Sequence, residues 1–327
     1  MSVLVLNKKE VEKNLTMKDC IGLMRETFAA LAKGASSNPL RSIIRLPNKK
    51  GLMGVMPGFA GENNIFGIKV LSVFPENYKA GISSHQGVVI LYEGDHGRLT
   101  AVLDAEVITA VRTAAVSALA TDLLSRKDSK VLAVLGAGVQ GRRHLESVSH
   151  VRHLDKVFVW DIEDRNSEAF VESESPQYDF QIEAVPSARE AVKDADIICT
   201  VTPAKKPILE SQWIKPGVHI NAVGGCTPDA QEIESGLMAR ARLYTDYRES
   251  LFNEPGDFLI PKSEGLITED HVKGELGELV LGDVSGRVSE SDITLFKALG
   301  LAVEDLAAGY FVYSRAASAN TGISLDL

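Results

Sequence analysis

Short hydrophobic runs in the first third of the chain are separated by Gly, Pro or Asn. The runs cover residues 41–46, 51–56, 65–74, 87–92 and 99–103, with a hairpin turn expected at residues 94–97. Such a pattern is typical of an antiparallel sheet. Ahead of these runs, residues 16–33 carry hydrophobic side chains at helical spacing and predict an amphipathic helix. The first third therefore predicts an α+β unit.

From residue 104 onward the pattern changes. We expect Asp104 to cap a long, Ala-rich helix that ends near Ser125. Continuous apolar runs then alternate with polar or helix-like segments, which predicts an α/β fold with a doubly wound parallel sheet whose strands are buried on both faces. The runs cover residues 131–135, 157–160, 196–200, 219–223 and 243–245.

The change of pattern predicts two domains. One covers residues 125–299, and the other combines residues 1–124 with residues 300–327. A C-terminal, Ala-rich helix is expected over about residues 291–315, and we expect it to return to the first domain.

Composition narrows the class of protein. The 327 residues include 35 Lys and Arg against 44 Asp and Glu, a net charge of −9, which argues against a nucleic-acid partner because such partners need a basic face. Three widely spaced cysteines fit a reducing compartment and exclude a CxxC metal site. No hydrophobic run approaches the roughly 18 residues of a membrane span, and the first residues lack the pattern of a signal peptide. We expect a cytoplasmic enzyme without a metal or a membrane contact.

A glycine-rich turn follows the apolar run at 131–135 and begins a segment that reads as a helix. Its sequence is Gly136-Ala137-Gly138-Val139-Gln140-Gly141. The first glycine permits a tight turn, the second lets the backbone approach a pyrophosphate, and the third lets the helix pack close to the strand. Free N–H groups at the start of the helix attract phosphate. In this context the turn predicts a dinucleotide site rather than a turn without a ligand.

Asp161 ends the next apolar run, twenty residues past Gly141. A carboxylate at this place accepts hydrogen bonds from the adenosine ribose and repels a 2′-phosphate. We therefore expect NAD(H) as the preferred cofactor, with NADP(H) as the alternative because Arg165 is close in sequence. A plain helix cap is the other interpretation of Asp161.

Two further runs end in polar or small residues. Thr200 and Thr202 follow one run, and Val223 and Gly224 follow the next. Ligands of doubly wound sheets lie beyond the carboxyl ends of the strands, so all four are candidates for cofactor contact. Ordinary strand-to-loop turns are the alternative.

Lys69 and Arg112 lie in apolar segments, where burial of a charged group is energetically unfavourable. Lys69 is in an apolar run and Arg112 is in the nearly apolar helix that begins at Asp104. A buried ammonium or guanidinium needs an anionic partner, and the guanidinium fork suits a carboxylate. The alternatives are an edge strand whose lysine reaches water and a structural ion pair, for example between Arg112 and Asp122.

Three motifs together resemble the ornithine cyclodeaminase/mu-crystallin family along nearly the whole chain. The segments Gly136-Ala-Gly-Val-Gln140, Val107-Ile-Thr-Ala-Val-Arg112-Thr-Ala-Ala and Ile220-Asn-Ala-Val-Gly-Gly225 resemble its GAGxQ, RTAA and INAxG motifs. The resemblance implies a Rossmann domain, a substrate-binding and dimerisation domain, and a homodimer. It also implies that Arg45, Lys69 and Arg112 bind the carboxylate of a small-molecule substrate.

Other residues bear on the reaction. Cys226 stands where related cyclodeaminases have an aspartate, and Asp229 is displaced by three residues. A thiol does not replace a carboxylate base at neutral pH without activation. The segment that contains Ser84 and His85 resembles the mu-crystallin branch, which reduces cyclic ketimines. Ser84 joins the cofactor-binding candidates.

We therefore expect NAD(P)H-dependent reduction of a cyclic ketimine carboxylate. The favoured substrate is Δ1-pyrroline-2-carboxylate, giving L-proline, and Δ1-piperideine-2-carboxylate, giving L-pipecolate, is its rival. Lys69 or His85 would keep the imine nitrogen protonated. The alternatives are an ornithine cyclodeaminase with Asp229 as base, an alanine dehydrogenase-like oxidation, and a nucleotide-dependent binding protein without catalysis.

Overall fold

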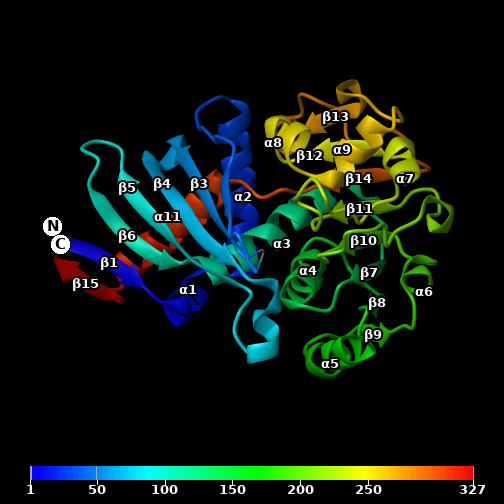
Figure 1. The fold of residues 1–327 in the computed structure, drawn as a ribbon, viewed down its shortest axis with the longest axis horizontal. Coiled ribbons are helices and arrows are strands. Elements are labelled where there is room, and N and C mark those ends of the chain that lie inside the picture. Colours follow the sequence, from blue (N-terminus) through cyan, green and yellow to red (C-terminus); the bar gives the residue numbers. More distant parts are fainter. Residues whose placement is uncertain (1, 49, 327) are drawn as a thin grey trace. The chain divides into compact units, whose positions relative to one another are not determined.

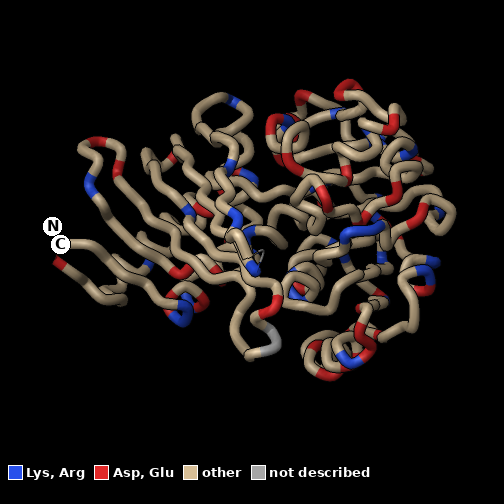
Figure 2. The backbone as a smooth tube through the Cα atoms, in the orientation of Figure 1, with Lys and Arg blue, Asp and Glu red and all other residues tan. Residues whose placement is uncertain are grey.

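The computed structural model describes residues 2–48 and 50–326 and divides into two compact units. Unit 1 comprises residues 1–112 and 300–327, and unit 2 comprises residues 113–299. The boundary expected near residue 124 therefore lies earlier, inside a helix rather than at its end. Acidic and basic residues are interspersed along the backbone of both units (Figure 2).

Unit 1 is built on a mostly antiparallel sheet with the strand order β15-β1-β6-β5-β4-β3-β2 (Figure 1). Its strands are β1 (Ser2–Leu6), β2 (Ser42–Arg45), β3 (Leu52–Ala60), β4 (Ile65–Val73), β5 (His85–Glu93), β6 (Leu99–Asp104) and β15 (Ile323–Asp326). Only the β1–β6 pair is parallel among these described strands. The five strands expected from the sequence are present, whereas β1 and β15 were not expected.

Unit 1 also contains helices. They are α1 (Lys8–Asn14), α2 (Met17–Ala32), the first part of α3 (Ala105–Leu124) and α11 (Ala302–Ser318), with short 3-10 turns η1 (Gly61–Asn63) and η2 (Pro75–Ala80). The amphipathic helix expected over residues 16–33 is present as α2, and Thr16 caps it through its side chain. Helix α11 lies against one face of β3, β4 and β5 (Figure 1). The C-terminal helix thus belongs to unit 1, but it begins at Ala302 rather than near residue 291.

Helix α3 is the apolar helix that Asp104 was expected to cap. The Asp104 carboxylate accepts the Val107 N–H at 3.1 Å. By length and composition alone α3 is the one described helix that qualifies as a membrane span, contrary to the expectation from the sequence. Because 83% of its apolar window is buried inside the protein, α3 has the character of a core helix.

Unit 2 contains an all-parallel sheet in the described chain, with the order β13-β12-β14-β11-β10-β7-β8-β9 (Figure 1). Its strands are β7 (Val131–Leu135), β8 (Lys156–Trp160), β9 (Gln181–Ala184), β10 (Ile197–Thr200), β11 (His219–Ala222), β12 (Arg242–Thr245), β13 (Val272–Glu275) and β14 (Thr294–Lys297). Its helices are α4 (Val139–Ser149), α5 (Asp164–Glu174), α6 (Ala188–Val192), α7 (Ser235–Arg240), α8 (Arg248–Asn253), α9 (Gly256–Ser263) and α10 (Leu276–Leu281), with η3 (Ser175–Gln177), η4 (Ser211–Trp213) and η5 (Glu269–His271). The predicted α/β, doubly wound fold is confirmed.

Both faces of this sheet are covered, as the continuous apolar runs predicted. Along β7, Leu132 and Val134 join the hydrophobic cluster on one face, whereas Ala133 and Leu135 join the cluster on the other. Chain order reverses between β7 and β10, because β8 and β9 lie on one side of β7 and the later strands lie on the other. Ligands of such sheets bind at this switch point, beyond the carboxyl ends of the strands.

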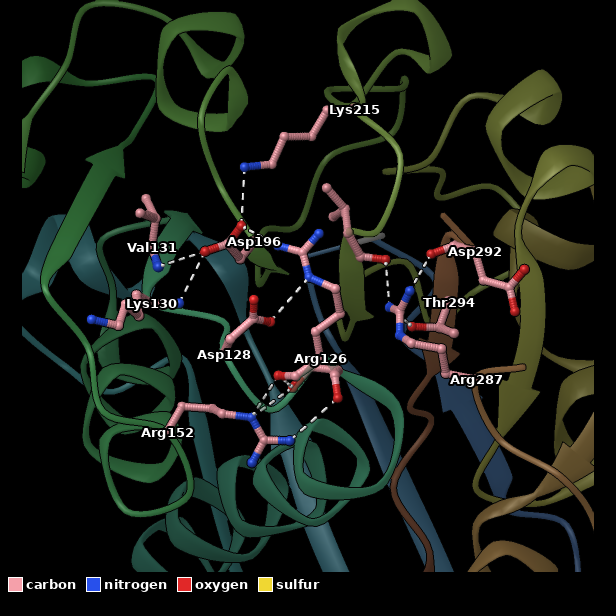
Figure 3. Close-up of polar contacts among 12 residues, drawn as sticks. Arg126, Asp128, Lys130, Val131, Arg152, Asp196, Lys215, Arg287, Asp292 and Thr294 are labelled. Atoms are coloured by element: carbon pink, nitrogen blue, oxygen red, sulfur yellow. Dashed lines mark hydrogen bonds and ion pairs between the residues drawn. The ribbon is translucent and has the colours of Figure 1, made fainter. Parts of the chain in front are cut away.

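The amino ends of β7 and β10 are joined by the side chain of Asp196. Its carboxylate accepts the backbone N–H groups of Lys130 and Val131 at 2.9 and 3.1 Å. The same carboxylate pairs with Arg126 and Lys215, both at 3.0 Å (Figure 3). This network holds the two central strands in register at the edge opposite to the ligand edge.

Candidate functional site

The sheet of unit 1 brings three of the predicted site residues to one face. The antiparallel register places Arg45, Leu52, Val73 and His85 in one row across β2, β3, β4 and β5. Lys69 is four residues before Val73 on β4, and since side chains alternate along a strand, it points to the same face. The two rows are roughly 13 Å apart along the strand, at about 3.3 Å per residue.

Lys69 is buried, with 1% of its surface exposed. Its Nζ lies 2.6 Å from Oδ2 of Asp305 and donates a hydrogen bond to Oγ1 of Thr109 at 3.4 Å. Burial and the charges of Arg112 and Arg41 lower the pKa of Lys69 to about 8, although Asp305 opposes this shift. Because β4 is an interior strand, the alternative of an edge lysine that reaches water is wrong.

Arg112 is held between two buried carboxylates. Its Nε lies 3.0 Å from Oδ1 of Asp305, and its Nη1 lies 2.7 Å from Oε2 of Glu304. Burial opposes the charged form, but the two carboxylates outweigh it and raise the pKa of Arg112. The structural ion pair considered from the sequence therefore exists, but its acids are not Asp122, which pairs with Lys127 and with another arginine.

The first turn of α11 supplies these acids, which sequence reasoning missed. The Glu304 carboxylate also accepts the Leu301 N–H at 3.0 Å, closing a capping box. Gly300 precedes this turn with a φ of 75°, and a Cβ there would lie 2.7 Å from Nη2 of Arg112. Arg41 donates to the Gly300 carbonyl at 2.9 Å. Glycine is thus required where the guanidinium of Arg112 meets the backbone.

Arg45, His85 and Ser84 lie outside this buried cluster. Arg45 and His85 are exposed. Nδ1 of His85 lies 2.9 Å from Oγ of Ser84. Partial desolvation and the nearby charge of Lys69 lower the pKa of His85. Ser84 belongs to unit 1, whereas the other predicted cofactor residues belong to unit 2.

The glycine-rich turn of unit 2 has the geometry that its sequence predicted. Gly136 has a φ of 112°, which L side chains rarely adopt. A Cβ on Gly141 would collide with the Gly136 carbonyl oxygen, so α4 packs directly on the turn. Gly138, the N-cap of α4, has open space beside it and provides no side-chain cap, while Val139 is exposed. Oε1 of Gln140 is buried and makes no hydrogen bond within the described chain. These features fit a pyrophosphate at the α4 N terminus.

Asp161 lies where a ribose-binding carboxylate is expected, directly after β8. Its Oδ2 accepts the Ala137 N–H of the glycine turn at 2.9 Å. Its Oδ1 accepts the Glu163 N–H at 3.1 Å and the Asn166 side chain at 3.0 Å. The carboxylate is therefore fixed beside the turn. The plain helix-cap interpretation is wrong, because the N-cap of α5 is Glu163. Arg165 is exposed.

Thr200 and Thr202, at the end of β10, are held by a residue that the sequence analysis did not identify. Glu232 is fully buried and its carboxylate accepts the Thr200 hydroxyl at 2.8 Å and both the N–H and the hydroxyl of Thr202 at 2.7 Å. Gly224, after β11, is equally close, because a Cβ there would lie 2.6 Å from the Glu232 carboxyl group. Val223 accepts a hydrogen bond from the Cys226 thiol at 3.2 Å.

Asp229 is exposed in the loop after β11. Its carboxylate pairs with Lys205 at 3.1 Å and accepts the Thr227 hydroxyl at 2.8 Å. These hydrogen bonds, first that from Thr227, lower the pKa of Asp229. Among the residues that the structure describes, no group of three or more His, Cys, Asp or Glu side chains is arranged to hold a metal ion.

The fold and these motifs agree with comparisons to known proteins. The model of the ornithine cyclodeaminase/mu-crystallin family matches residues 1–320, and the chain belongs to this family. The ketimine reductase mu-crystallin of Mus musculus is 37% identical over 312 residues, which cover 94% of this chain and 96% of that protein.

Two solved structures share the complete fold. The Δ1-pyrroline-2-carboxylate reductase of Thermococcus litoralis, in complex with NADH and L-proline, has a TM-score of 0.96 and 37% identity, and the match covers 99% of this chain and 100% of that one. An archaeal alanine dehydrogenase dimer with bound NAD has a TM-score of 0.95 and 29% identity, with 100% of both chains covered. The family resemblance read from the three motifs is thereby confirmed.

Proposed function

We propose that this protein is an NAD(H)-dependent reductase of small cyclic ketimines that carry a carboxylate beside the C=N bond. The favoured reaction is reduction of Δ1-pyrroline-2-carboxylate to L-proline, and Δ1-piperideine-2-carboxylate is the rival substrate. The names of the mouse and Thermococcus litoralis relatives support this assignment.

The observation that carries the proposal is the buried cluster of Lys69, Arg112, Glu304 and Asp305 in unit 1. Lys69 has a lowered pKa even though Asp305 is 2.6 Å away, because burial and the two neighbouring guanidinium groups outweigh that carboxylate. A substrate carboxylate adds negative charge that stabilises the protonated Lys69, and its oxygens can accept hydrogen bonds from Lys69 and Arg112. Arg45 is proposed as an outer contact, because it shares this face at a greater distance from Lys69.

Few side chains occupy the same face between the two rows. Between the row of Lys69 and the row of Arg45, the register aligns Gly54, Leu71 and Gly87. Two of these three positions add no side chain to the face. A five- or six-membered ring is therefore a reasonable size for the substrate, and positioning of the ring carbon is a large part of what this chemistry needs from the protein.

Residues of unit 2 would bind the cofactor, which supplies a hydride to the carbon of the C=N bond. The turn at Gly138 and the start of α4 would bind the pyrophosphate, and Asp161 would accept hydrogen bonds from the adenosine ribose. A carboxylate at Asp161 favours NAD(H) over NADP(H), because it would repel a 2′-phosphate. Thr202 and Gly224 would contact the other half of the cofactor.

The imine nitrogen must carry a proton while the carbon accepts the hydride. Lys69, with a pKa near 8, is protonated at neutral pH and still acidic enough to share its proton with the nitrogen. His85 is the second candidate on the same face. When the electron pair of the C=N bond moves to nitrogen, the product is a neutral or protonated secondary amine with no other group lost.

Ornithine cyclodeamination is less well supported. Its base would be Asp229, which is exposed and paired with Lys205. A homodimer is part of the proposal, supported by the dimer named for the archaeal alanine dehydrogenase. A cytoplasmic location is also proposed, because three free cysteines fit a reducing compartment. Size-exclusion chromatography with light scattering tests the dimer.

Parallel absorbance assays test the reaction. NADH with Δ1-pyrroline-2-carboxylate, NADH with Δ1-piperideine-2-carboxylate, NAD with L-ornithine, and NAD with L-alanine are followed at 340 nm, with ammonia measured in the third. We expect rapid NADH consumption in the first two. Ammonia without accumulation of NADH would replace the proposal by cyclodeamination, and NADH formation only from L-alanine would replace it by amino-acid oxidation. Binding of NADH without any turnover would favour a binding protein.

A further inference from the structure

Three charged side chains are fully buried together in unit 2, and none of them was expected from the sequence. Glu232, Asp257 and Lys297 are each 0% exposed. Nζ of Lys297 lies 3.0 Å from Oδ2 of Asp257. Oδ1 of Asp257 accepts the backbone N–H groups of Glu232 and Ile233 at 2.8 and 3.0 Å. Burying charge is costly unless every group is well paired.

Their contacts converge on the loops that follow β10 and β11. Glu232 accepts three hydrogen bonds from Thr200 and Thr202, at 2.7 to 2.8 Å. Lys297 donates to the carbonyl oxygen of Gly224. These loops are at the carboxyl ends of neighbouring parallel strands, beside the switch point where a dinucleotide binds.

The hydrogen bonds of the Thr202 hydroxyl determine whether it can donate to a ligand or accept from one. A hydroxyl has one hydrogen to donate and two lone pairs to accept with. An ionised carboxylate only accepts, so the hydrogen of Thr202 is committed to Glu232. The Ala204 N–H occupies one lone pair at 3.2 Å. One lone pair remains, and the hydroxyl can therefore meet a ligand as an acceptor.

Glu232 is ionised at mildly basic pH. Burial, followed by repulsion from Asp257, raises its pKa to about 7, while Lys297 and the hydrogen bonds from Thr202 limit the rise. Burial opposes the charge of Lys297 as well, but the attraction of Asp257, Cys226 and Glu232 outweighs it and raises the pKa of that ammonium. The network thus holds Glu232 as a pure acceptor above pH 7.

We propose that Glu232, held in place by Asp257 and Lys297, is a positioning residue that presents Thr202 as a hydrogen-bond acceptor to the nicotinamide riboside half of the dinucleotide. The inference rests on the proposed function, since it assumes that unit 2 binds NAD(H). Glu232 itself does not touch the ligand, because its side chain is fully buried. The adenosine half depends instead on the Asp161 side of the sheet.

Dissociation constants for two probes test this division of roles. NADH contacts both halves of the site, whereas ADP has the adenosine and both phosphates but no nicotinamide riboside. Glu232→Leu and Thr202→Val are titrated at pH 8 with each probe, by NADH fluorescence and by calorimetry for ADP. We expect each variant to bind NADH roughly three- to ten-fold more weakly, as for the loss of one hydrogen bond, with ADP affinity unchanged.

Glu232→Gln is the conservative variant. Its amide oxygen can still accept from Thr202 while its NH2 group donates to the Thr200 hydroxyl, so we expect NADH affinity close to that of the wild type. The double variant Glu232→Leu/Thr202→Val should be no weaker than either single variant, because both remove the same contact. Asp196→Asn is the matched control: it weakens an equally connected carboxylate at the opposite edge of the sheet and should leave both affinities unchanged (Figure 3).

The outcomes separate the inference from the proposed function. Equal loss of NADH and ADP affinity in Glu232→Leu, or no loss of either, would overturn the positioning role. Additive losses in the double variant would also overturn it. If Glu232→Leu does not fold, Thr202→Val carries the same expectation, and unchanged NADH affinity there refutes the inference. A wild-type protein that binds neither probe would overturn the proposed function together with this inference.

Discussion

Replacing Arg112 with methionine tests whether the buried cluster of unit 1 is held together by charge. The guanidinium contacts Asp305 at 3.0 Å and Glu304 at 2.7 Å, and both carboxylates are completely buried. Methionine has a similar length but no charge. In Arg112→Met, Lys69 stays beside Asp305, and Glu304 loses the cation that compensates it.

The magnitude follows from the burial of these groups. Removing one partner of a buried ion pair costs about 3–5 kcal/mol, because the remaining charge is left in a medium of low polarity. For domains of this size roughly 2–4 °C of melting temperature are lost per kcal/mol, so we expect a fall of roughly 6–20 °C. The loss should appear in the transition that unfolds unit 1, since Arg112 and its partners all belong to that unit.

The same variant should lose substrate affinity if Arg112 binds the substrate carboxylate. A hydrogen bond to a charged group contributes about 1.5–3 kcal/mol, so kcat/KM for Δ1-pyrroline-2-carboxylate should fall roughly ten- to hundred-fold, mainly through KM. Calorimetry and NADH absorbance measure the two effects. Glu304→Gln added to Arg112→Met should restore much of the stability, because the uncompensated charge is then gone, but none of the kcat/KM.

Arg152→Met is the matched control. The side chain of Arg152 is 4% exposed, compared with 5% for Arg112. It pairs at 3.3 Å with Asp122, which is partly exposed, and it donates to Ser125 and to the carbonyl of Thr121. We expect Arg152→Met to destabilise unit 2 with KM unchanged. A melting curve of Arg112→Met that matches the wild type would refute the charge argument. A KM that rises equally in both variants would refute the assignment of Arg112 to the substrate.

Three further predictions concern the cofactor, the pH dependence and the backbone. Asp161→Ser should weaken NADH binding and strengthen NADPH binding, because the carboxylate no longer meets the ribose hydroxyls or repels the 2′-phosphate; the ratio of the two dissociation constants measures this, and an unchanged ratio would contradict the role. Lys69 has a pKa lowered to about 8, so it is charged below that pH and neutral above it; KM for the substrate should rise between pH 7 and 9 in the wild type but not in Lys69→Arg, whereas equal rises would assign the effect to the substrate. Gly300→Ala should lower the melting temperature and raise KM, because its φ of 75° suits glycine and the new Cβ would displace the Arg112 guanidinium; wild-type values of both would show that the turn adapts.

Much of unit 2 could be predicted because its signals are local. The continuous apolar runs give strands that are buried on both faces, and the turn from Gly136 to Gly141 needs its glycines for reasons confined to a few residues. Asp161 was found by its spacing from that turn. Each of these features depends on one βαβ unit, so no knowledge of distant segments was required.

The strand β14 shows where local signals fail. Residues 291–301 were expected to begin the C-terminal helix, because the segment is apolar and merges with the Ala-rich sequence that follows. In the structure Thr294–Lys297 pairs in parallel with β11 and β12, and α11 starts only at Ala302. A strand inserted between two others is stabilised by its partners, and a short apolar run does not reveal those partners.

A charged residue within an apolar segment was the most informative signal in the sequence. It led only to cationic residues of unit 1. An ammonium or guanidinium in an apolar segment identified Lys69 and Arg112. The same criterion identifies Glu304 and Asp305, which interrupt an Ala-rich helix, and it identifies Lys297 at the end of an apolar strand. The argument is symmetric because burial penalises either sign of charge.

What the criterion cannot supply is the grouping of these charges. Arg112 meets acids nearly two hundred positions later in the chain, whereas Asp122, only ten residues away, pairs with Lys127. Lys297 likewise meets Asp257 rather than the nearby Glu304. A buried charge implies a partner of opposite charge, but the identity of that partner depends on the fold. The sequence therefore points to the residues of a site more readily than to the contacts that determine what each of them does.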